Sequence, residues 1–239
     1  MSLPWAALVR RPGPALPAEA AAQWQDYVSR LTDAGWSVHT LPPAGDALED
    51  VFAADAVAVV DGTALLTRSD RGLEKAVRDL GLAVTQVRPP LVLHGSDVIY
   101  APGPLESEPT VYVGRSGRST DDAACEIARR ACGSSVRVVQ VMMHDLPCLS
   151  AGMTVLPDGT PIGLPDRVDT SALPGLRVAL EPAGAHVAVL GERLLLLSQA
   201  APRTAAQLRA DGYQVTTVDI GTLEAAGGTV NRLSVLIRR

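Results

Sequence analysis

A cysteine, a histidine and an aspartate stand close together in this chain, and they are side-chain types that nucleophilic catalysis uses. Cys148 follows His144 by four residues, and Asp145 lies between them. A thiolate attacks electron-poor carbon, and a neighbouring histidine can accept the thiol proton. Free cysteines are also common as small buried side chains. Two interpretations of Cys148 therefore stay open: a substitute nucleophile, or a packing residue at the end of a strand.

Two aspartates stand beside apolar stretches where side chains of a site often lie. Asp55 precedes the run Ala56–Val60, so it either lines a pocket or simply flanks a strand. Asp97 follows Gly95 and Ser96, and an aspartate in such a tight corner commonly caps backbone amides. A catalytic role for Asp97 is the alternative.

Metal and phosphate chemistry lack a pattern in the sequence. The four histidines are scattered without metal-ligand spacing: His39, His94, His144 and His186. Gly-rich phosphate loops are absent, and the stretch at 156–161 is a turn that opens no apolar helix. We therefore expect no metal site and no cofactor.

Composition narrows the partners. The 239 residues carry a net charge of −5 and no basic cluster, which argues against nucleic acid as a partner. No apolar run reaches the roughly 18 residues that a membrane helix needs, so we expect no membrane partner. Prolines interrupt the N-terminal stretch where a signal peptide would be apolar. Three cysteines without CxxC spacing fit reduced thiols, and we expect a cytoplasmic protein.

A unit of short strands and one helix recurs about every forty residues, which is typical of a repeat array. Each unit has two strands, a helix and a third strand, in the periodicities expected of those elements. The expected units are strands 56–60, 64–67 and 83–87 with helix 71–80; strands 97–100, 110–113 and 136–142 with helix 120–132; and strands 186–190, 194–198 and 214–218 with helix 202–211.

The two ends of the chain supply one further unit. Strand 233–237 would pair with strand 6–9, followed by helix 18–32 and strand 37–41, which closes a ring. Residues 153–180 form the weakest unit, because four prolines leave little room for a helix. We expect an α/β fold of five units, one of them eroded, in a single domain over residues 1–239.

Several motifs, in order along the chain, resemble those of the dimethylarginine dimethylaminohydrolases of the guanidine-modifying (pentein) superfamily. Phe52-Ala53-Ala54-Asp55 is similar to that family's Phe-x-Glu-Asp, with Ala54 in place of the glutamate. Gly95-Ser96-Asp97-Val98 is similar to a Gly-Gly-Asp-Val turn. The segment 114–120 resembles one that carries an Arg-Thr-Asn signature, of which Arg118 remains. The resemblance implies a five-fold pseudo-symmetric ββαβ propeller whose ring is closed by the N- and C-terminal strands.

The resemblance fails at the residues that would carry the reaction. In the family, a Cys-x-Ser motif before the last strand carries the nucleophilic cysteine. The corresponding residues here are Arg232-Leu233-Ser234, so Arg232 stands in the place of that cysteine. Its acid/base histidine corresponds to Pro147 in the run 146–150. A carboxylate expected before the nucleophile corresponds to Gly227 or Gly228. Because catalytic groups of this kind act as a unit, hydrolysis by the family mechanism is not expected.

The resemblance leaves four candidate ligand-binding residues and three hypotheses. The candidates are Asp55, Arg71, Asp97 and Arg118. The first hypothesis is a catalytically inactive homologue that acts as a binding, regulatory or partner subunit. The second is an enzyme with a rebuilt pocket, using His144 and Cys148 beside the aspartates in a hydrolase-like step on a guanidine or amide C–N bond. The third is a scaffold, as in the ribosome anti-association factor that shares the propeller.

Each hypothesis predicts a different centre for the ring. Arg232 would fill it in the inactive homologue, polar groups would leave it open in a rebuilt enzyme, and apolar side chains would fill it in a scaffold. Arg232 either pairs with Asp55 as an internal ion pair or turns out to solvent. The partners that we expect are a small guanidine-type or amino-acid ligand, and a protein partner or a second copy of the chain.

Overall fold

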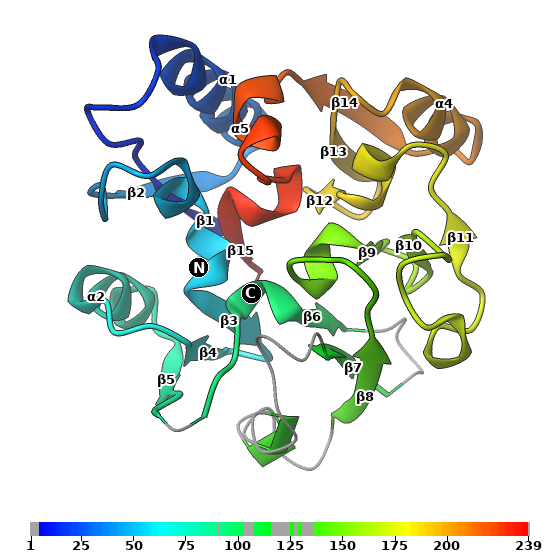
Figure 1. Ribbon diagram of the computed structural model, residues 1–239, viewed down its shortest axis with the longest axis horizontal. Coiled ribbons are helices and arrows are strands. Elements are labelled where there is room, and N and C mark those ends of the chain that lie inside the picture. The colour runs from blue at the N-terminus through cyan, green and yellow to red at the C-terminus, as the bar shows by residue number, and fades with distance from the viewer. Residues whose placement is uncertain are drawn as a thin grey trace.

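Five small sheets stand around a central axis in the computed structural model (Figure 1). The structure describes residues 5–89, 91–102, 108–115, 125–126, 129–130 and 136–238. Each sheet has three strands and forms one blade. The expected five-fold propeller of the pentein type is therefore confirmed.

The blades share one topology, in which an inner strand pairs antiparallel with a middle strand and the middle strand pairs parallel with an outer one. In the order inner, middle, outer the blades are β15 (Ser234–Ile237), β1 (Ala6–Arg10) and β2 (Ser37–Leu41); β3 (Val57–Val60), β4 (Thr63–Leu66) and β5 (Ala83–Gln86); β6 (Val98–Ala101), β7 (Thr110–Arg115) and β8 (Arg137–Met142); β9 (Met153–Val155), β10 (Pro161–Gly163) and β11 (Arg177–Val178); and β12 (Ala188–Val189), β13 (Leu194–Ser198) and β14 (Gln214–Val218).

Helices connect the middle to the outer strand, because parallel neighbours need a crossover. These are α1 (Ala18–Asp33), α2 (Arg71–Asp79) and α4 (Pro202–Ala210), and they lie on the outside of the ring (Figure 1). Asp70 caps α2 by accepting from the Leu73 N–H at 2.9 Å, and Leu73 and Val77 form its buried face. Of the helix expected at 120–132, only residues 125, 126, 129 and 130 are described, and all four are helical.

The fourth blade is the eroded one. Between β10 and β11 the chain forms a single 3-10 turn, Thr170–Ala172, in place of a crossover helix. Prolines 165 and 174 flank this segment and restrict it to extended and turn conformations. Two side chains near the outer edge, Val178 and Leu180, consequently remain exposed.

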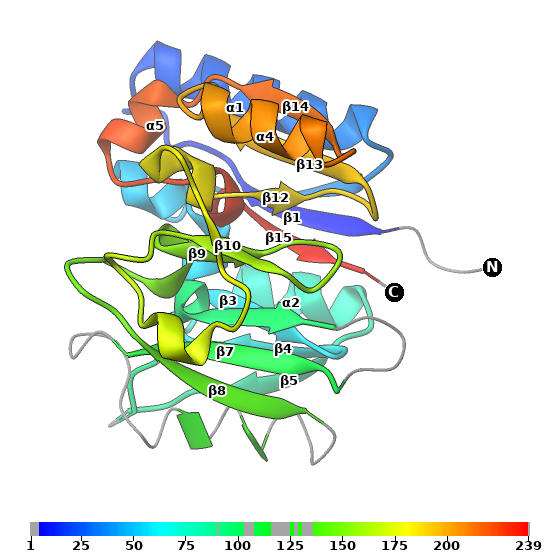
Figure 2. The same cartoon turned by 90° about the vertical axis from the view of Figure 1, so that its right-hand side faces the viewer.

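Ring closure by the two chain ends is confirmed. β15 runs antiparallel to β1 with Leu8 opposite Val235. The N-terminal end of β1 and the C-terminal end of β15 therefore lie on the same side of the molecule (Figure 2). Inside the blade, the Tyr27 hydroxyl of α1 bonds the Ser234 hydroxyl at 2.7 Å. The apolar contacts are built mostly from Val, Leu and Ala between neighbouring blades.

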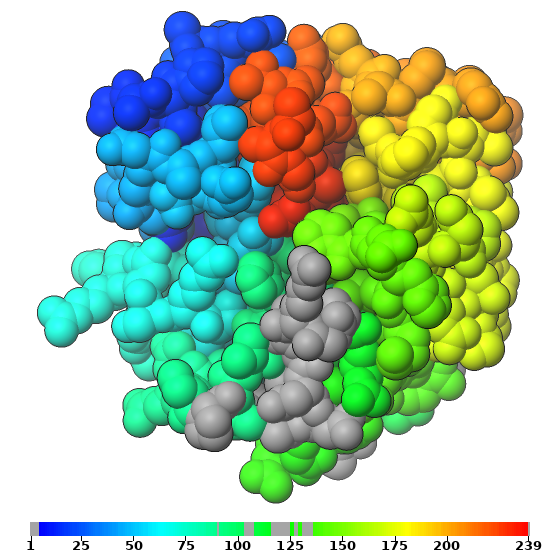
Figure 3. Space-filling view, viewed as in Figure 1, coloured from blue at the N-terminus to red at the C-terminus, as the bar shows by residue number. Residues whose placement is uncertain are grey.

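Some boundaries differ from the expectation. The strand expected at 186–190 is only Ala188–Val189, and those expected at 97–100 and 233–237 begin one residue later. In each case a 3-10 turn ends immediately before or close to the strand. The short helix α5 (Gly221–Ala225), seen beside the centre in Figure 3, was not predicted. Within the described residues, every helix is too short or too polar to cross a membrane.

Candidate functional site

The centre of the ring is built from five short 3-10 turns, each placed shortly before an inner strand. They are η2 (Ala53–Asp55), η3 (Gly95–Asp97), η4 (Leu149–Ala151), η6 (Pro182–Ala185) and η7 (Val230–Arg232). Because the inner strands lie nearest the axis, the turns before them bring residues from distant parts of the chain together (Figure 1). Asp55, Asp97 and Arg232 are each the last residue of their turn.

Arg232 points into this centre and pairs with Asp55. Its Nε donates to Oδ1 at 2.9 Å and its Nη2 to Oδ2 at 2.6 Å, so the pair is bidentate. The two side chains are 8% and 6% exposed, which makes this a buried ion pair. Of the two orientations open for Arg232, the structure has the inward one.

Three further groups hold the pair in place. The Nη1 atom of Arg232 donates to the Gly227 carbonyl at 2.5 Å. Its guanidinium carbon lies 4.7 Å from the centroid of the Phe52 ring, within range of a cation–π contact. Ser96 donates its hydroxyl to Asp55 Oδ1. Gly227 has φ +80°, a conformation that glycine adopts without strain.

Asp97 lies at the same centre but bonds the backbone. Its Oδ1 accepts from the Leu149 N–H at 2.8 Å, and the residue is fully buried. The bond ties turn η3 to turn η4 across 52 residues of chain. This contact fits the capping interpretation of Asp97.

Cys148 also faces the centre, and its thiol is held neutral. The side chain is 1% exposed and its Sγ lies 3.4 Å from the Ser150 hydroxyl. Burial raises the pKa of the Cys148 thiol above its ordinary value, although the nearby Arg232 charge opposes that rise. A nucleophilic cysteine needs the opposite shift.

The structure does not bring His144 to Cys148. His144 is exposed and lies near the half-buried Asp169 rather than near Cys148. The interpretation that groups His144 with Cys148, Asp55 and Asp97 in one pocket is therefore corrected. Four residues of separation in sequence did not place both on one face, because Asp145 takes φ +51° and turns the chain between them.

A different histidine lies near the centre. His186, at the end of turn η6, bonds the Ala151 carbonyl through Nε2 at 2.8 Å. Burial, together with the Arg232 charge, lowers the pKa of His186 to about 4. Its Nδ1 is buried and has no hydrogen-bond partner among the described residues. No sequence signal marked His186, because nothing in its local pattern predicts the turn before it.

The remaining candidates are Arg71, Pro147 and Arg118. Arg71 is exposed at the start of α2, on the outside of the ring, and Pro147 is exposed beside Cys148. Arg118 lies outside the described residues. Within the described part of the chain, no three His, Cys, Asp or Glu side chains are placed to hold a metal ion.

A comparison with curated proteins identifies the family. No family model matches the sequence. The N(G),N(G)-dimethylarginine dimethylaminohydrolase of Streptomyces coelicolor is 37% identical over 256 aligned positions, which cover 97% of this chain and 96% of that protein. An uncharacterised protein of Aeropyrum pernix is 30% identical and covers 92% of this chain and 84% of its own length.

Solved structures share the fold. A dimethylarginine dimethylaminohydrolase adduct with S-methyl-L-thiocitrulline matches with a TM-score of 0.81 at 19% identity, covering 98% of this chain and all of that one. The N-terminal domain of ArgZ, a cyanobacterial arginine dihydrolase, matches with a TM-score of 0.79 at 16% identity, covering 98% of both chains. The chain described here belongs to the dimethylarginine dimethylaminohydrolase family of the pentein superfamily.

Proposed function

We propose that this chain is a non-hydrolytic member of its family and acts as a binding, regulatory or partner subunit. The observation that carries the proposal is the Arg232–Asp55 pair. A guanidinium already lies against the central carboxylate, bidentate and buried. The chain thus places its own arginine where the family resemblance puts a guanidine ligand.

The groups around this pair support the same conclusion. Arg232 stands where the nucleophile is expected, and a guanidinium offers no lone pair for attack. The thiol nearest to it, Cys148, is kept protonated by burial. Pro147 has no proton to transfer, and His144 is exposed on the outside of the blade. These features support the loss of the thiolate and of the family's general acid, which this kind of hydrolysis needs together.

A rebuilt enzyme is the second candidate, and one observation favours it. Cys148 is close enough to Arg232, Asp55 and Asp97 for all three charges to act on its thiol. Such an enzyme would act on an arginine or a guanidine-derived small molecule, cleaving a C–N bond. It would have to expel the Arg232 guanidinium before any ligand reached Asp55.

Turnover assays separate the two candidates. Purified protein is incubated with arginine, asymmetric dimethylarginine or agmatine, and ureido products are measured together with released ammonia or dimethylamine. We expect no product above the protein-free blank, and no shift in melting temperature with the same compounds. A matched Cys148→Ala variant is assayed in parallel. Product formed by the wild-type chain and lost in Cys148→Ala would contradict the proposal and support the rebuilt enzyme.

A further inference from the structure

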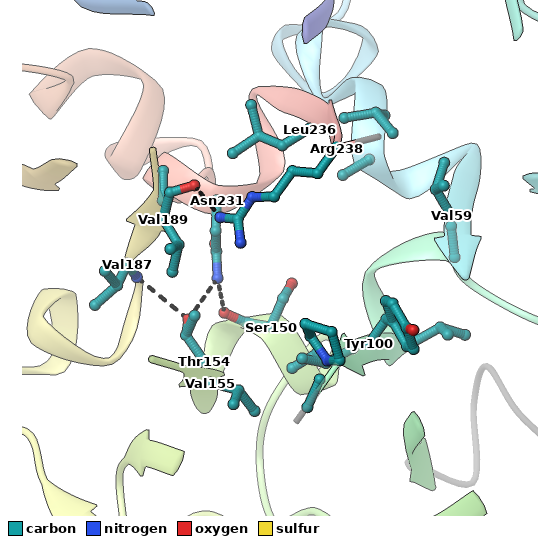
Figure 4. Close-up of a pocket in the computed structure, with 18 of the residues that line it drawn as sticks. Val59, Tyr100, Ser150, Thr154, Val155, Val187, Val189, Asn231, Leu236 and Arg238 are labelled. Carbon is teal, nitrogen blue, oxygen red and sulfur yellow. Dashed lines mark hydrogen bonds between the residues drawn. The ribbon is translucent and has the colours of Figure 1, made fainter. Parts of the chain in front are cut away.

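A cavity lies on the axis of the ring, on the side of the 3-10 turns that faces away from the Arg232–Asp55 pair. Its volume is about 580 Å³, within the range of small-molecule sites. The inner strands form its walls, and the hairpins at the far ends of those strands form its rim (Figure 4). The cavity therefore opens on the face toward which the inner strands run, away from the Arg232–Asp55 pair.

The floor of this cavity is polar and fixed by hydrogen bonds. Asn231 Nδ2 donates to the Ser150 carbonyl and to Thr154 Oγ1, both at 3.0 Å (Figure 4). Thr154 in turn donates to the Ala185 carbonyl at 2.8 Å and accepts from the Val187 N–H at 3.2 Å. This network joins three blades, so the floor is formed before any ligand arrives.

Arg238 brings a positive charge to the cavity. Its side chain extends from the end of β15 toward β12, where Nη2 donates to the Val189 carbonyl at 2.5 Å (Figure 4). The guanidinium carbon lies 5.6 Å from the centroid of the Trp5 ring. Arg238 is exposed as a whole residue, but its guanidinium is partly desolvated beside Val189 and Trp5, and this desolvation lowers its pKa. In the described part of the chain, no carboxylate lies within ion-pair distance of it.

The other charged residues of the lining form no ion pair with Arg238. Asp61 and Glu192 stand on hairpins at the rim, and both are exposed, as Arg238 is. Water and salt screen exposed charges efficiently. Between the floor and the rim, apolar side chains form much of the wall; three of them, Val59, Ile99 and Leu236, keep part of their surface open.

We propose that this cavity binds a small monocarboxylate with an apolar body. The carboxylate would pair with the Arg238 guanidinium, and the body would lie against Val59, Ile99 and Leu236. An arginine fork matches a carboxylate through two parallel N–H bonds, and such charge-assisted bonds are stronger than those between neutral groups. The proposal goes beyond the non-hydrolytic role, because the cavity lies on the other side of the turns from the Arg232–Asp55 pair. A ligand there does not have to displace Arg232 from Asp55.

A matched pair of probes tests the charge requirement. 4-Phenylbutanoate and its amide have nearly the same shape and differ in charge, and both are titrated into the full chain by calorimetry. We expect the carboxylate to bind at least about tenfold more tightly than the amide, because only the carboxylate forms charge-assisted bonds. Arg238→Gln should reduce that preference to about onefold. Arg11→Gln, at an exposed site outside the cavity, should retain the full preference.

A second variant tests the location. Val59→Phe narrows the wall and should weaken both probes without changing the far-ultraviolet circular dichroism of the chain. The proposal is overturned if neither probe binds the wild-type chain at about 10 mM. It is also overturned if acid and amide bind equally, or if Arg238→Gln keeps the preference for the acid.

Discussion

At the scale of single residues, the centre of this protein depends on one buried ion pair. Burying two charges costs desolvation free energy, which their attraction offsets only when geometry is good and other hydrogen bonds are made. Arg232 and Asp55 meet that condition through a bidentate contact supported by Ser96, Phe52 and the Gly227 carbonyl. Removing either partner would leave the other charge buried and unpaired.

This reasoning predicts a strongly non-additive double-mutant cycle. Asp55→Ala should lower the free energy of unfolding by about 3–5 kcal/mol, because the Arg232 cation is left without its partner. The double variant Asp55→Ala with Arg232→Met should cost clearly less than the two single changes added together. Urea unfolding followed by circular dichroism measures all four proteins. Additive costs would mean that the pair contributes no coupling.

His186 predicts a dependence of stability on pH. Its pKa is about 4 in the folded chain, below the ordinary 6.5, so the unfolded chain binds more protons between these values. Its contribution is therefore neutral above about pH 6.5 and becomes destabilising as the pH falls toward 4. Between pH 7 and pH 5 we expect a loss of about 1–2 kcal/mol in the free energy of unfolding.

The matched control for this prediction is His186→Gln, which keeps a donor for the Ala151 carbonyl but does not titrate in this range. The variant should lose less stability than the wild-type chain between pH 7 and pH 5. Equal losses in urea titrations at the two pH values would assign the pH dependence to other groups.

Sequence reasoning predicted several of the central residues and offered the Arg232–Asp55 pair as one of two orientations, but it did not predict the other contacts at the centre. Asp55, Asp97, Cys148 and Arg232 were identified from local motifs, and the turns bring all four together. Local spacing was misleading for His144, because a residue with positive φ redirects the chain beside it. The contacts of Arg232 with Phe52 and Gly227 depend on long-range packing, which no local pattern in the sequence encodes.

At the scale of elements, the ring of 3-10 turns leaves little free space. Gly95, the first residue of η3, packs directly on the backbone of Ala54 and Val57, and a methyl group there would overlap the Ala54 carbonyl. Strands were predicted well, because their apolar runs are continuous. The turns were not predicted, since three residues carry too little periodicity to be recognised.

Two glycine-to-alanine variants should therefore change stability in opposite directions. Gly95→Ala should lower the free energy of unfolding by about 3 kcal/mol, because backbone must move to admit the methyl group. Gly72→Ala, in α2, meets only ordinary contact and should raise it by about 0.5 kcal/mol through helix propensity. Thermal or urea unfolding of both variants provides the comparison. A stable Gly95→Ala protein would show that the turns can move apart.

At the scale of the whole molecule, the ring of turns divides the axis into two compartments. Two adjacent residues of η7 point to opposite sides of the ring of turns. Arg232 fills the centre with Asp55, and Asn231 forms part of the floor of the cavity on the other side. Repeat order was predictable, because each unit carries its own apolar pattern, and the closed five-bladed ring was what the resemblance to the pentein propeller implied. The division of the axis was not, because it depends on where five distant turns meet.

The pairing of β15 with β1 has a consequence for how the chain is made. β1 leaves the ribosome long before β15, because their sheet joins residues more than two hundred positions apart. Contacts of such separation form late and slowly. During synthesis β1 and β2 can pair once α1 has formed, but the inner edge of β1 stays unpaired until β15 has been made. Until then the nascent protein has an unpaired strand edge. Such an edge can pair with other chains and aggregate, and it is a target for chaperones.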